Sequence, residues 1–429
     1  MSGLLFSYYG DDFTGSTDVM EALGLHGVST VLFTRLPTAD ERRHFEGFRA
    51  IGIAGTSRSE TPEWMDQNLP HYFEWLKSLG ARFCHYKVCS TFDSAPEVGS
   101  IGRAIEIGAG IFRQRIIPLV VGAPQLKRYT AFGHLFAAYQ GQVYRIDRHP
   151  VMSRHPVTPM AESDLRLHLA TQTGLPVTLV PANALSTPDL GIDGILHFDV
   201  LDLATQLETG KQLLKLGPFL AGSSGVNYAV VKALIDEGSL VAETSFEPLA
   251  GADRIIAVSG SCSPTTARQI HHALNDGFSG LAADPILLAA PGNETEVRRL
   301  TGEAVSLLNR GQSVLVYTAL NAESDKSSAL DSIPGGRHRV GQALGRIARE
   351  SIAACGLKRA ILAGGDTSSH ALGQLDVFAL NMRFPLIDSP GSPLCRAHSN
   401  NPALDGLEIA MKGGQVGRDD YFTMLRDGT

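Results

Sequence analysis

The sequence predicts an α/β protein of two domains, each built on a mainly parallel β-sheet, with an antiparallel excursion in the first domain. The chain has 429 residues, which exceeds the size at which one hydrophobic core keeps growing. Short apolar runs alternate with helical segments along most of the chain, a pattern typical of parallel sheets covered by helices on both faces. Polar or glycine-rich loops follow many of these runs, and ligands bind outside the carboxyl ends of parallel strands.

The composition narrows the class of protein. The formal net charge is −7, without long runs of one sign, which argues against a nucleic-acid or membrane-surface partner. Five scattered cysteines with no C-x-x-C pair indicate neither a disulfide framework nor a zinc site. The N-terminus does not resemble a signal peptide, and no apolar stretch is long enough to span a bilayer. We expect a cytoplasmic protein with a small-molecule partner, and a homo-oligomer remains open.

The first domain is expected to span residues 1–240. An apolar run that begins at Leu4 ends in Asp11 and Asp12, and a helix is expected from Asp18 to Gly27 because Asp18 and Glu21 resemble a capping box. Further strands are expected at 30–34, 50–54, 81–88, 116–121, 177–180, 195–198 and 219–225. Further helices are expected at 61–79, 99–112, 162–170 and 202–216, and another follows the strand at 219–225 and ends at about residue 237. Pro70 is expected to kink or split the helix at 61–79. Alternating apolar and polar residues at 129–146 predict antiparallel strands.

The second domain is expected to span residues 254–429, after a linker at 238–253 that lacks a strong period. Strands are expected at 255–258, 314–317, 360–363 and 407–411. Pro264 is expected at the first position of a helix, and a short helix is expected at 419–425. Three glycine- or serine-rich loops follow predicted strands, at 259–263, 364–369 and 412–417.

These three loops indicate a nucleotide site. A glycine-rich loop between a strand and a helix exposes backbone N–H groups, which bind phosphate together with the helix dipole. Each loop alone is also typical of an ordinary tight connection, but three in one domain favour a nucleotide. The chain has no G-x-x-x-x-G-K-[ST] motif and no clear G-x-G-x-x-G with a downstream acid, so neither a P-loop nor a dinucleotide fold is predicted.

Polar residues also end three strands of the first domain. They are Asp11 and Asp12, then Arg58, then Lys87 with Ser90 and Thr91. Such a set suits a hydroxy acid, because cations bind a carboxylate and an aspartate can accept the proton of a reacting alcohol. Helix capping is the alternative for the two aspartates, so we expect one to cap and one to face the ligand. A solvated surface charge is the alternative for Arg58 and Lys87.

We assign no catalytic or metal-binding role to several other motifs. His149 and His155 lie in an Arg-His-Pro repeat without acidic or cysteine residues at ligand spacing, which favours an ordinary loop over a metal site. His271 and His272 fall inside a predicted helix and point in different directions. The serine-rich loops contain no G-x-S-x-G elbow, which lowers a serine-hydrolase interpretation.

Taken in order, these motifs resemble the four-carbon acid sugar kinases, which include 3-oxo-tetronate and D-threonate kinases. The resemblance runs along essentially the whole chain. It is carried by Asp11 to Asp18 with Ser16 in place of alanine, by Arg58, by Lys87 to Thr91, by Ser259 to Ser263, by Gly364 to Ser368 with Asp366 in place of glutamate, and by Lys412, Gly414 and Gly417.

The resemblance implies a sugar-acid-binding domain followed by an ATP-binding domain, with the active site in the cleft between them. The expected reaction is the ATP- and Mg²⁺-dependent phosphorylation of a hydroxyl of a small sugar acid such as threonate, erythronate or 3-oxo-tetronate. Asp12, with Asp11 as the alternative, would orient or deprotonate that hydroxyl, and Arg58, Lys87, Ser90 and Thr91 would bind the acid. The nucleotide would be held by Ser259, Ser261, Gly364, Gly365, Asp366, Thr367, Lys412 and Gly414, with Asp366 also facing Mg²⁺ through water.

One segment departs from the family pattern. Cys89 stands where the family has an aspartate, and Phe92 to Pro96 replace the usual arginine-glycine, which alters one wall of the substrate pocket. Asp93 is a candidate to supply the missing carboxylate from a shifted position. Two other functions stay open at this stage: a non-catalytic sensor of a sugar acid or nucleotide, and a dehydrogenase of similar acids.

Overall fold

A computed structural model describes residues 3–155, 157–242, 244–320, 326, 329–330 and 332–428. The chain divides into two compact units, Met1–Thr244 and Ser245–Thr429. The described residues between 238 and 253 form neither helix nor strand. Each unit contributes its own run of neighbouring strands and has its own core.

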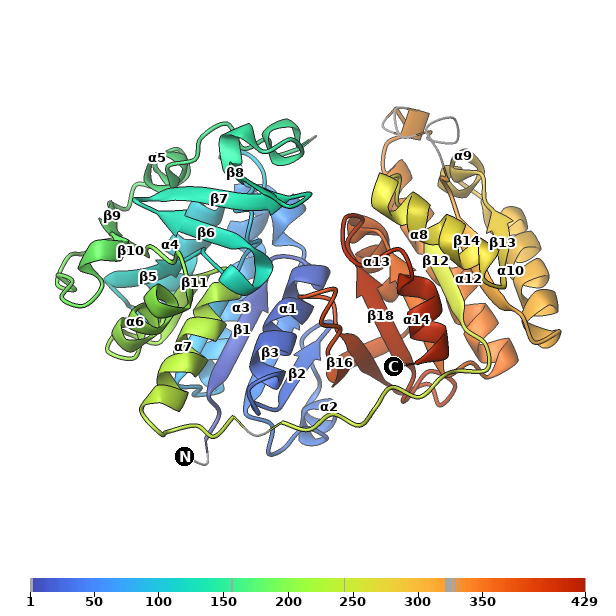
Figure 1. Cartoon of the computed structure of the whole chain (residues 1–429), viewed down its shortest axis with the longest axis horizontal. Coiled ribbons are helices and arrows are strands. Elements are labelled where there is room, and N and C mark those ends of the chain that lie inside the picture. The colour runs from blue at the N-terminus through green and yellow to red at the C-terminus, as the bar shows by residue number, and fades with distance from the viewer. Residues whose placement is uncertain are drawn as a thin grey trace. The chain divides into compact units, whose positions relative to one another are not determined.

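The first unit is organised on a parallel sheet, as the sequence predicts (Figure 1). In spatial order its strands are β2 (Thr30–Phe33), β3 (Ala50–Ala54), β1 (Phe6–Gly10), β4 (Phe83–Lys87), β11 (Phe219–Gly222), β5 (Ile116–Val120), β10 (Gly194–Phe198) and β9 (Val177–Val180). All neighbouring pairs run parallel. The strands that carry the predicted polar residues, β3, β1 and β4, are therefore adjacent.

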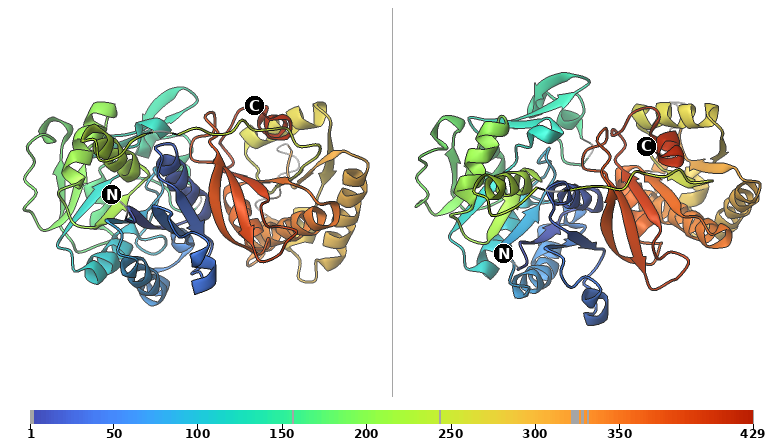
Figure 2. Two further views of the ribbon diagram at one scale, coloured as in Figure 1. Left: turned by 90° about the horizontal axis from the view of Figure 1, so that it is seen from below. Right: turned by 60° about the horizontal axis from the view of Figure 1, so that its bottom comes forward.

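Helices cover both faces of this sheet. One face carries α1 (Phe13–Gly24), α6 (Leu203–Leu213) and α7 (Gly225–Asp236), and the other carries α3 (Pro62–Ser78) and α4 (Ile101–Phe112) (Figures 1 and 2). Two short helices, α2 (Ala39–Arg43) and α5 (Leu165–Ala170), lie in the connections. Of the two expectations for Pro70, a kink or a split, the split is wrong, because α3 continues through Pro70, with buried residues on both sides of it holding the helix against the sheet; the kink stays a prediction.

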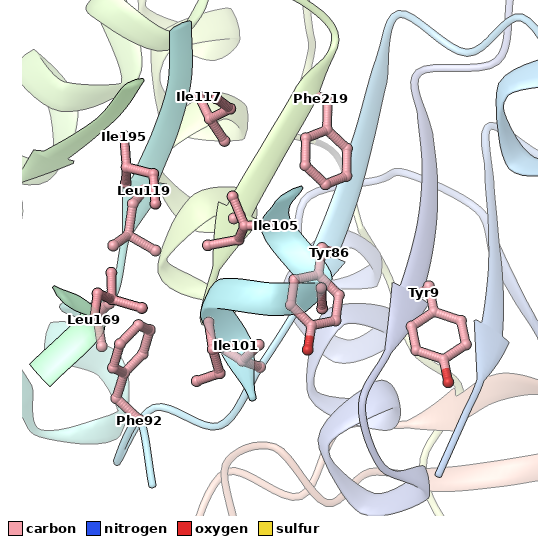
Figure 3. Close-up of a cluster of buried hydrophobic side chains, with 14 of the residues drawn as sticks. Tyr9, Tyr86, Phe92, Ile101, Ile105, Ile117, Leu119, Leu169, Ile195 and Phe219 are labelled. Atoms are coloured by element: carbon pink, nitrogen blue, oxygen red, sulfur yellow. The ribbon is translucent and has the colours of Figure 1, made fainter. Parts of the chain in front are cut away.

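One core of the first unit lies between the sheet and helices α3 and α4. Phe73 packs against Tyr9, Tyr86 and Phe219, with ring centroids 5.6 to 5.9 Å apart. Figure 3 shows Tyr9 and Tyr86 of this core on neighbouring strands, with Phe219 next to Tyr86. The edge-to-face contacts of Phe73 with these rings fix the separation of sheet and helix, so the strand ends have a rigid base.

A small antiparallel sheet, expected from the alternation at 129–146, is confirmed. It contains β6 (Arg128–Ala131), β7 (His134–Tyr139) and β8 (Gln142–Arg145), and lies at the top of the unit in Figure 1. Backbone hydrogen bonds join Ala123 to Arg128 in both directions and Thr130 to Val200. Since Ala123 and Val200 follow β5 and β10, the small sheet is anchored at the carboxyl ends of these two strands.

The second unit has a mixed sheet, in the order β13 (Phe278–Ala282), β14 (Ser313–Tyr317), β12 (Ile256–Ser259), β15 (Arg359–Ala363), β18 (Glu408–Lys412), β17 (Leu394–Ser399) and β16 (Val377–Phe384). The first five are parallel, and β17 and β16 are antiparallel to their neighbours. Helices α8 (Pro264–Asn275) and α14 (Tyr421–Asp427) cover one face, and α10 (Glu294–Asn309) and α12 (Gly336–Cys355) the other (Figure 2). Among the described residues, no helix is long and apolar enough to cross a membrane.

Two leucines of helix α5 test the packing of the first core. Leu169 is fully buried in that core, whereas the side chain of Leu167 is 58% exposed. We expect Leu169→Ala to lower the free energy of unfolding of the first unit by about 2 to 5 kcal/mol. The matched control Leu167→Ala should change it by no more than about 0.5 kcal/mol, because Leu167 is exposed. Both substitutions alter helix propensity equally, so the difference between the two variants reports the loss of core packing. Urea unfolding measures both, and equal effects would show that α5 does not contribute to the core as described.

Candidate functional site

The two aspartates that follow β1 take different positions. Asp12 is the N-cap of α1: its Oδ1 accepts from the Gly15 N–H at 2.8 Å and its Oδ2 from the Thr14 hydroxyl at 3.0 Å. The expectation that the helix begins at Asp18 is therefore wrong, because Asp12 starts the helix one turn and a half earlier and leaves Asp18 inside it, buried. Asp11 is buried and does not cap.

Arg58 joins both aspartates. It lies on a 3₁₀ turn, η1 (Ser57–Ser59), after β3. Its Nη1 donates to Asp12 Oδ2 at 2.9 Å, and its Nε and Nη2 lie 3.3 and 3.5 Å from the oxygens of Asp11. The turn is itself fixed, since the Arg58 N–H donates to the Asp11 carbonyl at 3.1 Å. Gly99, with φ of +64°, packs so closely that a Cβ there would lie 2.4 Å from the Arg58 carbonyl oxygen.

Burial and charge act in opposite directions at this triad. Burial raises the pKa of Asp11 to about 6, although the Arg58 charge acts to lower it. Burial would lower the pKa of Arg58, but Asp11 and Asp12 raise it well above its ordinary value. Asp11 is thus a carboxyl group that changes its protonation near neutral pH, and Arg58 stays charged.

Lys87, at the end of β4, faces the first turns of α1. Its ammonium lies 3.5 Å from Asp18 Oδ2, and both side chains are buried. A Cβ at Gly15 would lie 3.2 Å from the Lys87 nitrogen, so the ammonium reaches the turn that Asp12 caps. Burial raises the pKa of Asp18, and Lys87 opposes that shift.

The segment after β4 forms a hydrogen-bonded wall. The Cys89 thiol lies 2.9 Å from the Thr91 hydroxyl, and this hydroxyl donates to Asp93 Oδ1 at 2.5 Å. Asp93 Oδ2 accepts from the Thr158 hydroxyl at 3.3 Å. Burial acts to raise the pKa of Asp93, but the Arg58 charge and Thr91 lower it below its usual range. Asp93 is thus a buried carboxylate near Arg58, and Ser90 lies half-buried at the start of the same turn.

Thr158 was not predicted as a site residue, because no motif near it indicates a role. It meets Asp93 only because the chain turns back after the small antiparallel sheet. His149 and His155 order their own loops: Nδ1 of each accepts backbone N–H groups, from Val151 and Met152 and from Thr158 respectively. In the part of the chain that the structure describes, no three His, Cys, Asp or Glu side chains are grouped to hold a metal ion.

In the second unit, the loop after β12 is a chain of serine turns. Ser259, at the end of the strand, accepts from the Ser261 N–H at 3.4 Å, Ser261 from the Ser263 N–H at 3.2 Å, and Ser263 from the Thr265 N–H at 3.2 Å. Helix α8 then begins with Pro264 at its first position, as predicted. The loop is ordered by its own hydroxyl groups.

The three predicted loops come together. A Cβ at Gly260 would lie 2.3 Å from the Thr367 hydroxyl oxygen, and one at Gly414 would lie 2.8 Å from the Ser261 hydroxyl oxygen. Gly364, with φ of +110°, caps helix α13 (Gly365–Leu372). Only residues without a Cβ allow these loops to approach so closely. The side chain of Asp366 lies outside the described part of the structure.

A pocket of about 170 Å³ lies over the first two of these loops; Ser259, Lys412 and Gly414 are not among its lining residues. The predicted residues Ser261, Gly364, Gly365 and Thr367 line it, together with residues that the sequence did not indicate. The added lining residues are Gly260, Cys262, Pro285, Thr318, Lys326, Leu330, Arg337 and Val340. Thr318 could have been found, because it directly follows a predicted strand. Lys326 and Arg337 add cationic side chains to a lining of small polar and apolar residues, and the Lys326 ammonium is paired with Asp284 Oδ2 at 2.8 Å.

Lys412 lies beneath the third loop. Its side chain is fully buried, its ammonium donates to the Thr266 hydroxyl at 3.0 Å, and that hydroxyl donates to the Gly414 carbonyl at 2.9 Å. The ammonium also lies 5.7 Å from the centre of the Tyr421 ring. Burial lowers the pKa of Lys412 to about 7. Lys412 therefore connects the end of β18 to the backbone of the loop that contains Gly414.

Comparison with known proteins gives two domain matches and several full-length relatives. Residues 6–244 match the sugar-binding N-terminal domain and residues 256–422 the nucleotide-binding C-terminal domain of one family. The chain is 44% identical to a 3-oxo-isoapionate kinase of Paraburkholderia graminis over 451 residues, covering 100% of this chain and 95% of that one. It is 28% identical to a 3-oxo-tetronate kinase of Escherichia coli, covering 90% of this chain and 98% of that one.

Solved structures share the fold. A Salmonella typhimurium protein superposes with a TM-score of 0.76 at 23% identity, covering 98% of each chain. A Haemophilus influenzae protein superposes with a TM-score of 0.71 at 22% identity, covering 98% of this chain and 99% of that one. At these identities the likeness concerns the fold alone.

The burial of Lys412 predicts a pH dependence of stability. Its ordinary pKa in the unfolded chain is 10.5 and its pKa in the fold is about 7, so between these values the unfolded chain binds a proton that the folded chain does not. The free energy of unfolding should therefore rise with pH in this window, by up to about 1.4 kcal/mol per pH unit, and this gain is lost progressively as the pH falls from about 10.5 to 7, below which both states carry the proton. Lys412→Met removes the titrating group and should remove the rise.

Urea unfolding of the second unit at pH 7.5, 8.5 and 9.5 measures this dependence. The stability of Lys412→Met relative to the unsubstituted protein should fall steadily with increasing pH. Lys358→Met, which changes an exposed lysine of the same unit, serves as the control and should leave the profile unchanged. Parallel profiles for the Lys412 variant and the unsubstituted protein would contradict the lowered pKa.

Proposed function

Because the chain belongs to the four-carbon acid sugar kinase family, with its sugar-binding and nucleotide-binding domains, we propose that it transfers the γ-phosphate of ATP to a hydroxyl of 3-oxo-isoapionate or a closely related oxo sugar acid. The observation that carries this proposal is the 44% identity with a 3-oxo-isoapionate kinase along the whole chain. The fixed triad of Asp11, Asp12 and Arg58 in the sugar-binding domain supports it.

The acceptor chemistry is assigned to the first unit. A bond forms between the acceptor oxygen and the γ-phosphorus, the bond to the bridging oxygen of ADP breaks, and the hydroxyl proton passes to a carboxylate. We propose Asp12 for this proton, with Asp11 as the alternative. Arg58 holds both carboxylates in place, and with Lys87, Ser90 and Thr91 it binds hydroxyl groups of the acid. Such transfer depends mainly on positioning and charge neutralisation.

The nucleotide is assigned to the pocket of the second unit. Ser259, Ser261, Gly364, Gly365, Thr367 and Gly414 would present backbone N–H groups and hydroxyls to the phosphates. Lys412 would act through the loop, by holding the Gly414 carbonyl through Thr266. Lys326 and Arg337, which line the pocket, would add positive charge.

Mg²⁺ is proposed as the companion of ATP. Mg²⁺ keeps several waters and is commonly bound by substrate phosphates with one or two carboxylates. The described side chains include no ready-made metal cluster, which fits an ion that arrives with the nucleotide. Asp366 remains the proposed carboxylate for a water-mediated contact.

A panel of sugar acids tests the proposal directly. Purified protein with Mg-ATP should form ADP in the presence of 3-oxo-isoapionate, with a higher kcat/KM than for 3-oxo-tetronate, threonate or erythronate. The reason is the wall at Cys89 to Asp93, which departs from the family pattern and makes the four-carbon acids a poorer fit. Coupled measurement of ADP release gives the values. ATP binding without acid-dependent turnover would reject the kinase and leave the sensor.

Substitution of the proposed base gives a second test. Asp12→Asn keeps helix capping, because asparagine caps about as well as aspartate, but it cannot accept the proton. It should lower kcat by about 10²- to 10⁴-fold with little change in the KM for ATP.

The matched control is Asp202→Asn. Asp202 caps α6 in the same way, by accepting from the Thr205 N–H at 2.8 Å, and its substitution should leave kcat unchanged. If Asp12→Asn is fully active while Asp11→Asn is not, the proton is accepted by Asp11.

A further inference from the structure

The proposed acceptor site contains more negative than positive charge. Four carboxyl groups and two cations surround it. They are Asp11, Asp12, Asp18 and Asp93, with Arg58 and Lys87. Arg58 is bonded to two of the carboxylates and Lys87 faces a third. The carboxylate of a sugar acid would therefore meet no uncommitted positive charge among these residues.

Arg128, at the start of β6, differs from both cations. Its Nη1 donates only to main-chain carbonyls, those of Leu126 at 3.0 Å, Lys127 at 3.2 Å and Ala138 at 3.5 Å. Its Nε is buried and has no hydrogen-bond partner. No acidic side chain within the described ranges forms an ion pair with it. Its positive charge is therefore not neutralised, and one buried donor is unused.

The fold places Arg128 on the same edge of the sheet as the altered wall. Ala123, which is paired with Arg128, comes three residues after the end of β5, and Cys89 comes two residues after the end of β4. Only β11 separates these strands, so their ends are about 10 Å apart.

Cys89 is close enough to both arginines for its charge to act on them. Burial lowers the pKa of Arg128, and an ionised Cys89 would counteract this shift, as it would raise the pKa of Arg58. Burial raises the pKa of Cys89 itself, so the thiol is neutral near pH 7. A neutral side chain near both arginines leaves the charge of Arg128 available to a ligand.

We infer that Arg128 binds the carboxylate of the sugar acid, while Arg58 is committed to Asp11 and Asp12. This inference rests on the proposed kinase function and assigns the acid-recognising cation to the small antiparallel sheet. A guanidinium with a free Nε can take a carboxylate through two parallel hydrogen bonds. Arg128 would thereby determine that the substrate is an acid, not a neutral sugar.

The test compares an acid with its neutral counterpart. The dissociation constants of 3-oxo-isoapionate and of its primary amide are measured by calorimetry for the unsubstituted protein, Arg128→Gln, Arg128→Lys and the control Lys127→Gln. Arg128→Gln should reduce the preference for the acid over the amide by about 10- to 100-fold. Arg128→Lys should restore part of the preference, and Lys127→Gln, at an exposed neighbouring position, should leave it unchanged.

A second variant covers the case that Arg128→Gln does not fold. Cys89→Asp places a carboxylate near both Arg58 and Arg128 and should weaken binding of the acid by about 10-fold or more, with a smaller effect on the amide. Equal weakening of acid and amide in the folded variants, or unchanged selectivity in Arg128→Gln, would overturn the assignment. Turnover by the unsubstituted protein tests the kinase function separately, since a kinase with unchanged selectivity in Arg128→Gln rejects only the role of Arg128.

Discussion

The first unit depends on one ion-pair arrangement, in which Arg58 holds the adjacent carboxylates of Asp11 and Asp12. Adjacent residues in an extended strand point to opposite faces, so both can meet one guanidinium only where the strand has ended and the chain turns into a helix. The parallel register of β1 and β3 pairs Gly10 with Ala54, and this brings the turn after β3 beside the turn after β1. The strand register therefore brings the charged groups together, and their ion pairs hold the two turns side by side.

The same arrangement sets the pKa of a buried carboxyl group, that of Asp11. Asp11 is removed from water, which penalises its charged form, and Arg58 recovers only part of that penalty, so the pKa of Asp11 stays near 6. A group with this pKa exchanges protons near neutral pH. The carboxylate of Asp12 is held in place by the Gly15 N–H and the Thr14 hydroxyl at the start of α1, from which it accepts hydrogen bonds. The two aspartates thus have separate roles, one fixed by the helix and one set by burial.

The sequence predicted the sheet architecture well and the junctions less well. Continuous apolar runs gave β3 and β9 with their observed bounds. Strands β16 and β17 were missed because Asn381, Arg383 and Arg396 interrupt their apolar pattern. The start of α1 was misplaced because Asp12 caps without the acidic residue at the third position that makes a capping box recognisable. The roles of the acceptor-site and nucleotide residues remain predictions, although the loops that carry the nucleotide residues do meet in space.

Contacts made by chain reversal could not be predicted at all. Thr158 reaches Asp93 and Arg128 reaches the edge of the main sheet only because the β6–β8 sheet is inserted after β5.

The two units differ in how a change of substrate specificity could arise. Under the proposed function, the glycines and serine turns of the second unit would bind phosphate through their backbone groups whatever the acceptor molecule is. The first unit would recognise the acid through a few charged side chains and the neutral Cys89 near them, so a change of one of these residues would alter which acid is bound. Acceptor specificity would then change through the first unit while the loops for the nucleotide stay the same.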